Sequence, residues 1–188
     1  MVATLIRPTT GVLSVLGQDV TRHSELIRGQ IELVGHGTHV YEDLTAVENL
    51  KVWTTLAGRR ADDRTLRAAL AAVDLEAVAD QRARTFSAGM KRRLSLARFV
   101  NAGLRLLLLD EPAGGLDQQG KKWLAEFLLA FKTGSNSVLM ASHDLGRSLD
   151  VADRIVILGR GTVALDRPAA DLDRERLRAL YEFHAEAA

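Results

Sequence analysis

The sequence predicts an α/β fold with a wound parallel sheet, and two features of the chain support this. Residues 106–109 are four consecutive leucines. The run is too short for a stable helix and is bounded by a Pro and Gly cluster, so it is typical of a strand buried on both faces of a parallel sheet. The rest of the chain alternates strand and helix patterns, as wound sheets do.

The first third of the chain contains short elements. The apolar piece 2–6 comes before a turn and resembles the last turn of a helix, although no capping residue precedes it. The loop that follows the second expected strand contains His36 and His39. Their spacing raises the question of a metal site, but no Cys or carboxylate accompanies them in a matching pattern, so we interpret both as loop residues. The expected elements here are a strand over 12–16, one or two helical turns over 21–28 and a strand over 31–34.

Residues 45–100 are predicted to form a helical subdomain inserted between strands of the sheet. Thr45 and Glu48 have the spacing of a capping box, in which each side chain satisfies a free amide near the other, and helical spacing follows to residue 56. A second helix is predicted over 64–73. The sequence shows no internal repeat and no low-complexity linker.

Ser87 and Gly89 stand at the start of another predicted helix. Such a start exposes free backbone amides, and together with the helix dipole these make an anion site suited to phosphate. The alternative is a capped helix whose first turn, with Lys91, Arg92 and Arg93, is basic and solvated. The sequence alone leaves both interpretations open.

The leucine strand ends in two adjacent carboxylates, Asp110 and Glu111. Open parallel sheets carry their chemistry at the carboxyl ends of strands, and alternation sends neighbouring side chains in opposite directions. One carboxylate would therefore hold a hard cation such as Mg²⁺ while the other polarises a water. The alternative is a strand that ends in two acids without function, as surface strand ends often do.

The last part of the chain continues the alternating pattern. A strand over 137–141 ends in Ser142, His143 and Asp144, and Asp144 is expected to cap the helix that follows to about 151. The other elements expected here are an amphipathic helix over 116–131, a strand pair over 155–158 and 162–165, and a charged amphipathic helix over 174–188.

Composition limits the classes of function. The chain has 188 residues, of which 47% are apolar, so it is long enough for one domain with a core. A net charge of +1 gives no reason to expect a nucleic-acid partner, and the absence of cysteine is compatible with a reducing cytosol. We find neither an apolar run of bilayer length nor a signal peptide, so membrane association is expected to go through a partner.

Three motifs then occur in a characteristic order: FSAGMKRRLSLAR, LLLLDEPAGGLD and LMASHD. Together they resemble the signature motif, the Walker B strand with its D-loop, and the switch histidine of ABC-type ATPases, over residues 3–165. The resemblance implies a P-loop-NTPase-like α/β fold. In it, Asp110 would hold Mg²⁺, Glu111 would orient the attacking water as a base, and His143 would contact the γ-phosphate of ATP. The reaction would be in-line phosphoryl transfer.

The resemblance also implies that part of each nucleotide site comes from a second subunit. Ser87 and Gly89 of the signature, and Asp117 of the D-loop, would face ATP held by that partner. Two departures in the signature are mild: Ala88 stands where many members have Gly, and Met90 where many have Gln. A third is less mild, because Gly37 stands where the family usually has a metal-contacting Gln.

The largest departure is the absence of the phosphate loop G-x-x-x-x-G-K-S/T, whose amides and lysine hold the phosphates. Residues 115–121 match its start, but Lys122 stands where Ser or Thr is required and no strand precedes the match. We expect the chain to begin just beyond this Walker A strand and loop. By the family's sheet order, the lacking strand would lie between those at Val138 and Ile155, so two inner strand edges would be unpaired.

These observations predict an ATP-binding and ATP-hydrolysing subunit of an ABC transporter, with ATP and Mg²⁺ as cofactors. Its expected partners are a transmembrane permease and a second ATP-binding subunit, with no nucleic acid, and its expected location is the cytoplasmic face of the cell membrane. Lys91, Arg92, Arg93 and the DEPAGGLD loop resemble small exporter subunits, with the haem exporter of cytochrome c maturation as the suggested relative.

Two alternatives remain. In the first, the chain would be a catalytically inactive half-site whose signature motif completes the nucleotide site of a partner. In the second, it would be an ATPase head of the DNA-repair or chromosome type. The second alternative is disfavoured because residues 45–84 show no sustained heptads. The expected domain organisation is a partial ATP-binding domain over 1–165 and a C-terminal amphipathic helix over 166–188.

Overall fold

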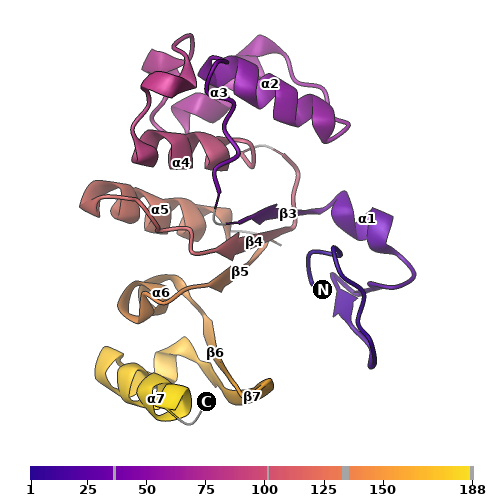
Figure 1. The fold of residues 1–188 in the computed structure, drawn as a ribbon, viewed down its shortest axis with the longest axis vertical. Coiled ribbons are helices and arrows are strands. Elements are labelled where there is room, and N and C mark those ends of the chain that lie inside the picture. The colour runs from indigo at the N-terminus through magenta and orange to yellow at the C-terminus, as the bar shows by residue number, and fades with distance from the viewer. Residues whose placement is uncertain (36, 101, 133–135, 187–188) are drawn as a thin grey trace.

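A three-stranded parallel sheet lies at the centre of the molecule, with the strand order β3-β4-β5 (Figure 1). The computed structural model describes residues 1–35, 37–100, 102–132 and 136–186. Leu108 of the central strand pairs with Leu33 on one side and Leu139 on the other. The parallel sheet predicted from the sequence is therefore confirmed. Its strands are β3 (Ile31–Val34), β4 (Leu106–Asp110) and β5 (Ser137–Ala141).

Both faces of β4 are buried, and its four leucines are at most 8% exposed. Because side chains alternate along a strand, Leu107 and Leu109 face one cluster while Leu106 and Leu108 face another. The first cluster includes side chains from α5 (Gln118–Phe131), which covers that face. The second includes residues of the N-terminal segment, where the elements are β1 (Ser14–Val15), β2 (Gln18–Asp19) and α1 (Ser24–Arg28).

The C-terminal part forms a separate two-stranded antiparallel sheet of β6 and β7, which confirms the predicted strand pair. Arg154 donates two hydrogen bonds to the carboxylate of Asp166 across this pair. Asp144 accepts a hydrogen bond from the Arg147 amide and caps the helix that follows it, as predicted. The elements are α6 (Leu145–Val151), β6 (Arg154–Gly159), β7 (Thr162–Pro168) and α7 (Arg174–Glu186).

Two strand edges are open. Within the described part of the chain, β5 pairs only with β4 and β6 pairs only with β7. Apolar side chains on these strands are exposed, Leu139 by 52% and Leu158 by 72%. The open inner edges expected between these strands are therefore found. Unpaired amides beside exposed apolar residues favour pairing with a further strand.

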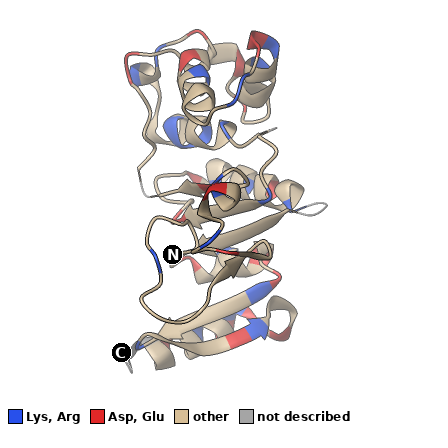
Figure 2. Cartoon of the chain, turned by 90° about the vertical axis from the view of Figure 1, so that its right-hand side faces the viewer, with Lys and Arg blue, Asp and Glu red and all other residues tan. Residues whose placement is uncertain are grey.

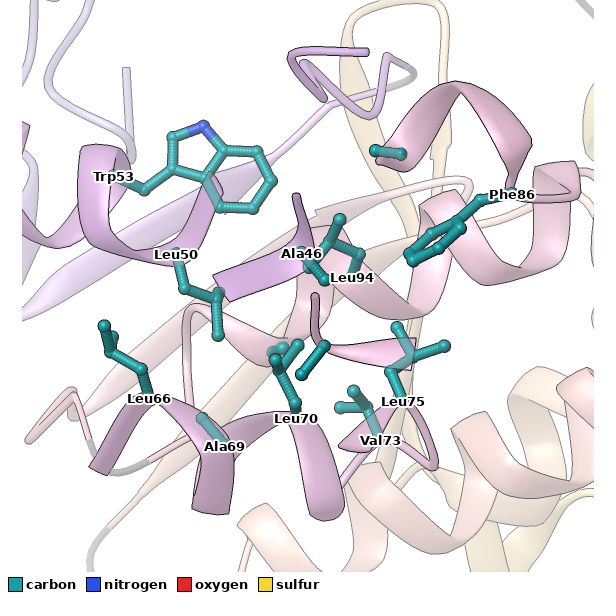
Figure 3. Packing of buried hydrophobic residues seen from close by; sticks show 13 residues of the cluster. Ala46, Leu50, Trp53, Leu66, Ala69, Leu70, Val73, Leu75, Phe86 and Leu94 are labelled. Atoms are coloured by element: carbon teal, nitrogen blue, oxygen red, sulfur yellow. The ribbon is translucent and has the colours of Figure 1, made fainter. Parts of the chain in front are cut away.

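The helical subdomain has a core of its own (Figure 3). Leu50 and Leu70 are almost fully buried in it, and Leu94 joins it from α4. The predicted capping box is present, since the Thr45 hydroxyl accepts the Glu48 amide at 3.2 Å and the Glu48 carboxylate accepts the Thr45 amide at 2.8 Å. The helices are α2 (Ala46–Leu56), α3 (Asp63–Ala71) and α4 (Ala88–Ala97), with short 3-10 turns over Glu76–Val78 and Ala83–Thr85.

The prediction that residues 2–6 end a helix is wrong. The structure has turns and bends there, and Thr4 adopts a φ of 59° in the left-handed region. A single non-glycine residue in that region interrupts helical backbone geometry. Apolar composition alone misled the sequence interpretation, because no cap or longer periodic run supported a helix.

The contrast between the buried strand and the open edge gives a first prediction. Leu107→Ala should lower the free energy of unfolding by about 2–5 kcal/mol, because Leu107 is fully buried and its truncation leaves a cavity. The same substitution at Leu139, on the open edge of β5, should cost less than about 1 kcal/mol. Urea denaturation followed by circular dichroism measures both. Equal losses would contradict the described burial.

Candidate functional site

Glu111 and His143 meet at the carboxyl ends of β4 and β5. The Glu111 amide donates to the carbonyl of Ala141 at 3.0 Å, which ties the end of β4 to β5. The Glu111 carboxylate accepts a hydrogen bond from the His143 amide at 2.7 Å, and the His143 Nε2 lies 3.7 Å from the same oxygen. The structure therefore brings together two of the predicted site residues, although they are separated by 32 positions in sequence.

The backbone of Glu111 explains how its carboxylate turns toward β5. Glu111 has a φ of 46°, in the left-handed region that few non-glycine residues adopt. Its carbonyl accepts a hydrogen bond from Gly114 at 3.1 Å, which closes the turn after the strand. Strained backbone of this kind often occurs at functional sites. The side chain of Glu111 is 28% exposed and that of His143 is 82% exposed, so both are accessible to a ligand.

Asp110 ends β4 as an exposed residue. Its donor chemistry fits Mg²⁺, which is commonly held by one or two carboxylates together with substrate phosphates. The structure shows no cluster of three or more His, Cys, Asp or Glu side chains that would hold a metal, over the residues that it describes. His36 lies outside those residues. At Gly37 an added Cβ would meet only the His39 ring at 3.5 Å, an ordinary contact.

Ser87 caps α4, since its hydroxyl accepts a hydrogen bond from the Met90 amide at 3.2 Å. Ser87 is exposed and Gly89 is partly exposed, so the start of this helix faces outward. A Cβ added at Gly89 would meet Leu116 at 3.7 Å, which a side chain tolerates. The fold therefore does not require glycine at this position.

Asp117 lies at the start of α5, directly after a segment that packs against the start of α4. Its side chain accepts the Gly120 amide at 2.7 Å and so caps α5, a structural role that the sequence interpretation did not assign. Leu116, which precedes it, is the residue nearest Gly89. The structure thus holds Gly115 and Leu116, just before Asp117, against the start of α4 that carries Ser87 and Gly89. A Cβ at Gly120 would lie 3.0 Å from the Asp117 carboxylate, so close packing explains why glycine stands there. Gly120 was part of the rejected phosphate-loop match.

The interpretation of the first turn of α4 as basic and solvated is wrong. Lys91 forms an ion pair with Glu42. Arg93 donates to the carbonyl of Val73 at 3.3 Å. Arg92 is only 2% exposed. Tertiary contacts therefore occupy all three cations, whereas the predicted cap itself is confirmed.

Arg92 is the main site residue whose place the sequence did not reveal. Its guanidinium donates to carbonyl oxygens of the loop that contains Glu111, and burial lowers its pKa. One sequence signal existed, because Leu96 follows Arg92 by four positions and so shares its face of α4. Tyr181 of α7 was also missed. Its hydroxyl lies 3.4 Å from Nδ1 of His143, and no sequence pattern links residues so distant in the chain.

A cavity of about 690 Å³ separates the helical subdomain from the outer edge of the sheet. Its lining includes Leu33 of β3 and Trp53 of α2. Arg98 lies over the Trp53 ring, 5.5 Å from its centroid, and donates to the carbonyl of Leu33. Arg28 and Arg59 contribute further positive charge to the lining. The cavity is therefore largely apolar, and its charged lining residues are mainly basic, with Glu32 as the acidic one. Sequence patterns gave no indication of it.

Comparison with known proteins identifies the family. The family model described as "ABC transporter" matches residues 1–114. The chain belongs to this family. The resemblance inferred from the three motifs is thereby confirmed. The α/β architecture with a parallel sheet agrees with this assignment.

Several relatives have descriptive names. The daunorubicin/doxorubicin resistance ATP-binding protein DrrA of Streptomyces peucetius is 34% identical over 178 residues, which are 92% of this chain and 53% of that protein. The Nod factor export ATP-binding protein I of Neorhizobium galegae is 32% identical over 174 residues, 92% of this chain and 50% of that protein. The phosphonates import ATP-binding protein PhnC of Burkholderia pseudomallei (strain K96243) is 36% identical over 139 residues, 72% and 45% respectively.

This ABC-family chain thus spans about half the length of the curated relatives that it matches. Among solved structures, it resembles the dimeric post-hydrolysis state of the ATP-binding cassette MJ0796 bound to ADP and Pi. The TM-score is 0.76 at 22% identity, and the match covers 89% of this chain and 77% of that one. At this identity the likeness establishes the fold alone.

The two possible roles of Ser87 can be separated by substitution. Ser87→Ala should lower the free energy of unfolding by about 1 kcal/mol, because the cap of α4 is lost. Ser87→Asp should retain most of the stability, because a carboxylate also caps a helix, while placing a negative charge on this exposed surface. Thermal or urea denaturation checks both values. A stability loss in the Asp variant as large as that in the Ala variant would contradict the capping role.

Proposed function

We propose that this chain is part of an ATP-binding and ATP-hydrolysing subunit that drives export through a membrane partner. The observation that carries the proposal is the meeting of Glu111 and His143 at the ends of two neighbouring parallel strands. Family membership supports it, since the chain belongs to the ABC transporter family.

In this proposal each residue acts through its position. Glu111 orients the attacking water and accepts its proton, and His143 contacts the γ-phosphate from the neighbouring strand end. Asp110 would hold Mg²⁺, which neutralises charge that develops on the phosphates. Ser87 and Gly89 present the start of α4 to ATP bound by a second subunit.

The phosphate loop must come from a segment outside these 188 residues, because no G-x-x-x-x-G-K-S/T occurs within them. The open edges of β5 and β6 support this, because a strand that pairs there would end beside Glu111 and His143. Such a strand would also cover exposed Leu139 and Leu158. A longer polypeptide or a separate one would supply it equally well.

The proposed membrane partner is a permease, with the chain at the cytoplasmic face. No helix in the described ranges is long and apolar enough to cross a membrane. The cavity beside Trp53, with Arg28 and Arg59 at its lining, fits a short apolar partner segment that carries acidic residues. The transported substrate is left open. The sequence motifs suggested haem, whereas relatives of this chain are named for daunorubicin and doxorubicin resistance and for Nod factor export.

The DNA-repair and chromosome alternative receives no support from the helical subdomain. Helices α2 and α3 are 11 and 9 residues long and pack on a common core, so neither extends into a coiled coil. Basic and acidic residues are interspersed along the ribbon in Figure 2, whereas nucleic-acid binding favours a clustered basic patch.

A second candidate function is a half-site that completes the nucleotide site of a partner. The packing of Leu116 against Gly89 favours it, because this contact holds the signature and the D-loop on one surface without a phosphate loop. In that case Ser87, Gly89 and Asp117 contact ATP bound by the partner, while the site at Glu111 binds no nucleotide.

The main proposal is tested by supplying the phosphate loop. The chain alone should not bind Mg-ATP at micromolar concentration, whereas a fusion to the strand, loop and helix of the Streptomyces peucetius relative should bind and hydrolyse it. In the fusion, Glu111→Gln should lower turnover by about a hundredfold or more and leave binding intact, because Glu111 acts on the water. Titration calorimetry and phosphate release measure these outcomes.

Glu126→Gln is the matched control, since Glu126 lies on the exposed face of α5 and pairs only with Lys122 among the ion pairs found. It should keep full turnover. Normal turnover in Glu111→Gln would exclude Glu111 as the base. Tight Mg-ATP binding by the chain alone would show that a phosphate loop is not needed.

The half-site candidate has its own test. The chain is mixed with the Streptomyces peucetius relative carrying a disabled signature motif, and ATP turnover is measured. Rescue that disappears in Gly89→Asp supports the half-site, because the fold tolerates a Cβ there and the carboxylate would repel phosphate. Gly146→Asp, where a Cβ would meet only the Arg174 side chain at 3.9 Å or more, serves as the control. No rescue by the folded chain contradicts this candidate.

A further inference from the structure

Arg92 is a buried cation at the junction of three elements. It lies on α4, five positions after the capping Ser87, and is 2% exposed. No ion pair within 4.0 Å joins its guanidinium to an acidic side chain in the described ranges, although the charge of the Asp110 carboxylate attracts it. A buried charge without an ionic partner is unfavourable unless hydrogen bonds compensate it. The contacts of its guanidinium therefore require an explanation.

The compensation comes from four backbone carbonyl oxygens. Nε donates to Pro112 at 3.0 Å, and Nη1 donates to Gly35 at 3.0 Å. Nη2 donates to Glu111 at 3.1 Å and, more weakly, to Asp110 at 3.4 Å. Three of these carbonyls belong to consecutive residues at the end of β4, and the fourth follows β3. One planar side chain thus joins α4 to the ends of two parallel strands.

We propose that Arg92 is a positioning residue that holds Glu111 in its left-handed backbone conformation and so aims its carboxylate at His143. A φ of 46° is unfavourable for glutamate and needs support from its surroundings. Arg92 and Gly114 both donate to the Glu111 carbonyl at 3.1 Å, and the Glu111 amide is held by Ala141. With the peptide fixed in this way, the carboxylate reaches the His143 amide at 2.7 Å.

The same contacts couple two parts of the molecule. Because Ser87 and Arg92 lie on one helix, a displacement of the start of α4 moves the guanidinium and with it the carbonyls of Asp110, Glu111 and Pro112. The surface that carries the signature is thereby linked to the proposed catalytic carboxylate within one chain. The catalytic meaning of this link rests on the proposed function, whereas the link itself rests on the contacts alone.

Amide hydrogen exchange on the full chain, read by NMR, tests the inference. Arg92→Lys keeps the charge but cannot reach four carbonyls, because lysine lacks the planar fork. It should speed exchange of the His143 and Gly114 amides by about tenfold or more, since their acceptors on Glu111 are no longer fixed. The Leu108 amide in the buried centre of β4 should change by less than about threefold.

Arg93→Lys is the matched control, because Arg93 is the next residue on α4 and bonds Val73 in the helical subdomain instead. It should leave His143 and Gly114 exchange unchanged. Uniform acceleration of all amides in Arg92→Lys, or no acceleration at His143, would overturn the inference. If Arg92→Lys does not fold, exchange of the Arg92 Nε–H is measured in the unsubstituted chain instead. Slow exchange supports the inference, and rapid exchange overturns it.

This experiment separates the two proposals. Selective exchange at His143 and Gly114, combined with an inactive phosphate-loop fusion, would leave the positioning role standing and remove the proposed function. An active fusion whose Arg92→Lys variant shows unchanged exchange would do the reverse.

Discussion

The burial of β4 on both faces is the constraint on which the rest of the structure depends. Each of its leucines contributes about 1.5–3 kcal/mol through burial, and the alternating faces draw on different parts of the chain. Side chains of α5 cover one face of β4, and side chains of the N-terminal segment, including α1, cover the other. Because β3 and β5 pair with this strand in parallel, their carboxyl ends lie at the same edge of the sheet. The positions of Asp110, Glu111 and His143 follow from that edge.

At this edge the chain must change from strand to helix within a few residues. Pro112 cannot continue the ladder, and Glu111 turns the backbone through the left-handed region. The turn is held by Gly114, by Ala141 of β5 and by the buried guanidinium of Arg92. The backbone of Glu111 is thus held by its own loop, by β5 and by a side chain of α4, which preorganises its carboxylate toward His143.

The outer edge of β5 and the separate sheet of β6 and β7 are less well buried than β4. Leu139 on β5 and Leu158 on β6 are exposed, and β6 and β7 form a sheet of their own within the described residues. The Arg154–Asp166 pair and the packing of α7 against β6 hold this small sheet together (Figure 1).

The sequence by itself determined the central strand, the helix caps at Thr45, Ser87 and Asp144, and the family. These are local features, because a periodic pattern or a cap is decided within a few residues. The sheet order and its open edges followed only once the family resemblance was added to that local pattern.

Only the tertiary structure decided how the site is held together. Glu111 and His143 are 32 positions apart, and Arg92 and Gly35 are 57 apart, so no local pattern predicts their hydrogen bonds. The burial of Arg92 contradicted the expectation of a solvated basic turn, because four carbonyls at strand ends replaced water around its charge. Long-range packing therefore fixed the geometry of residues whose identities the motifs had already indicated.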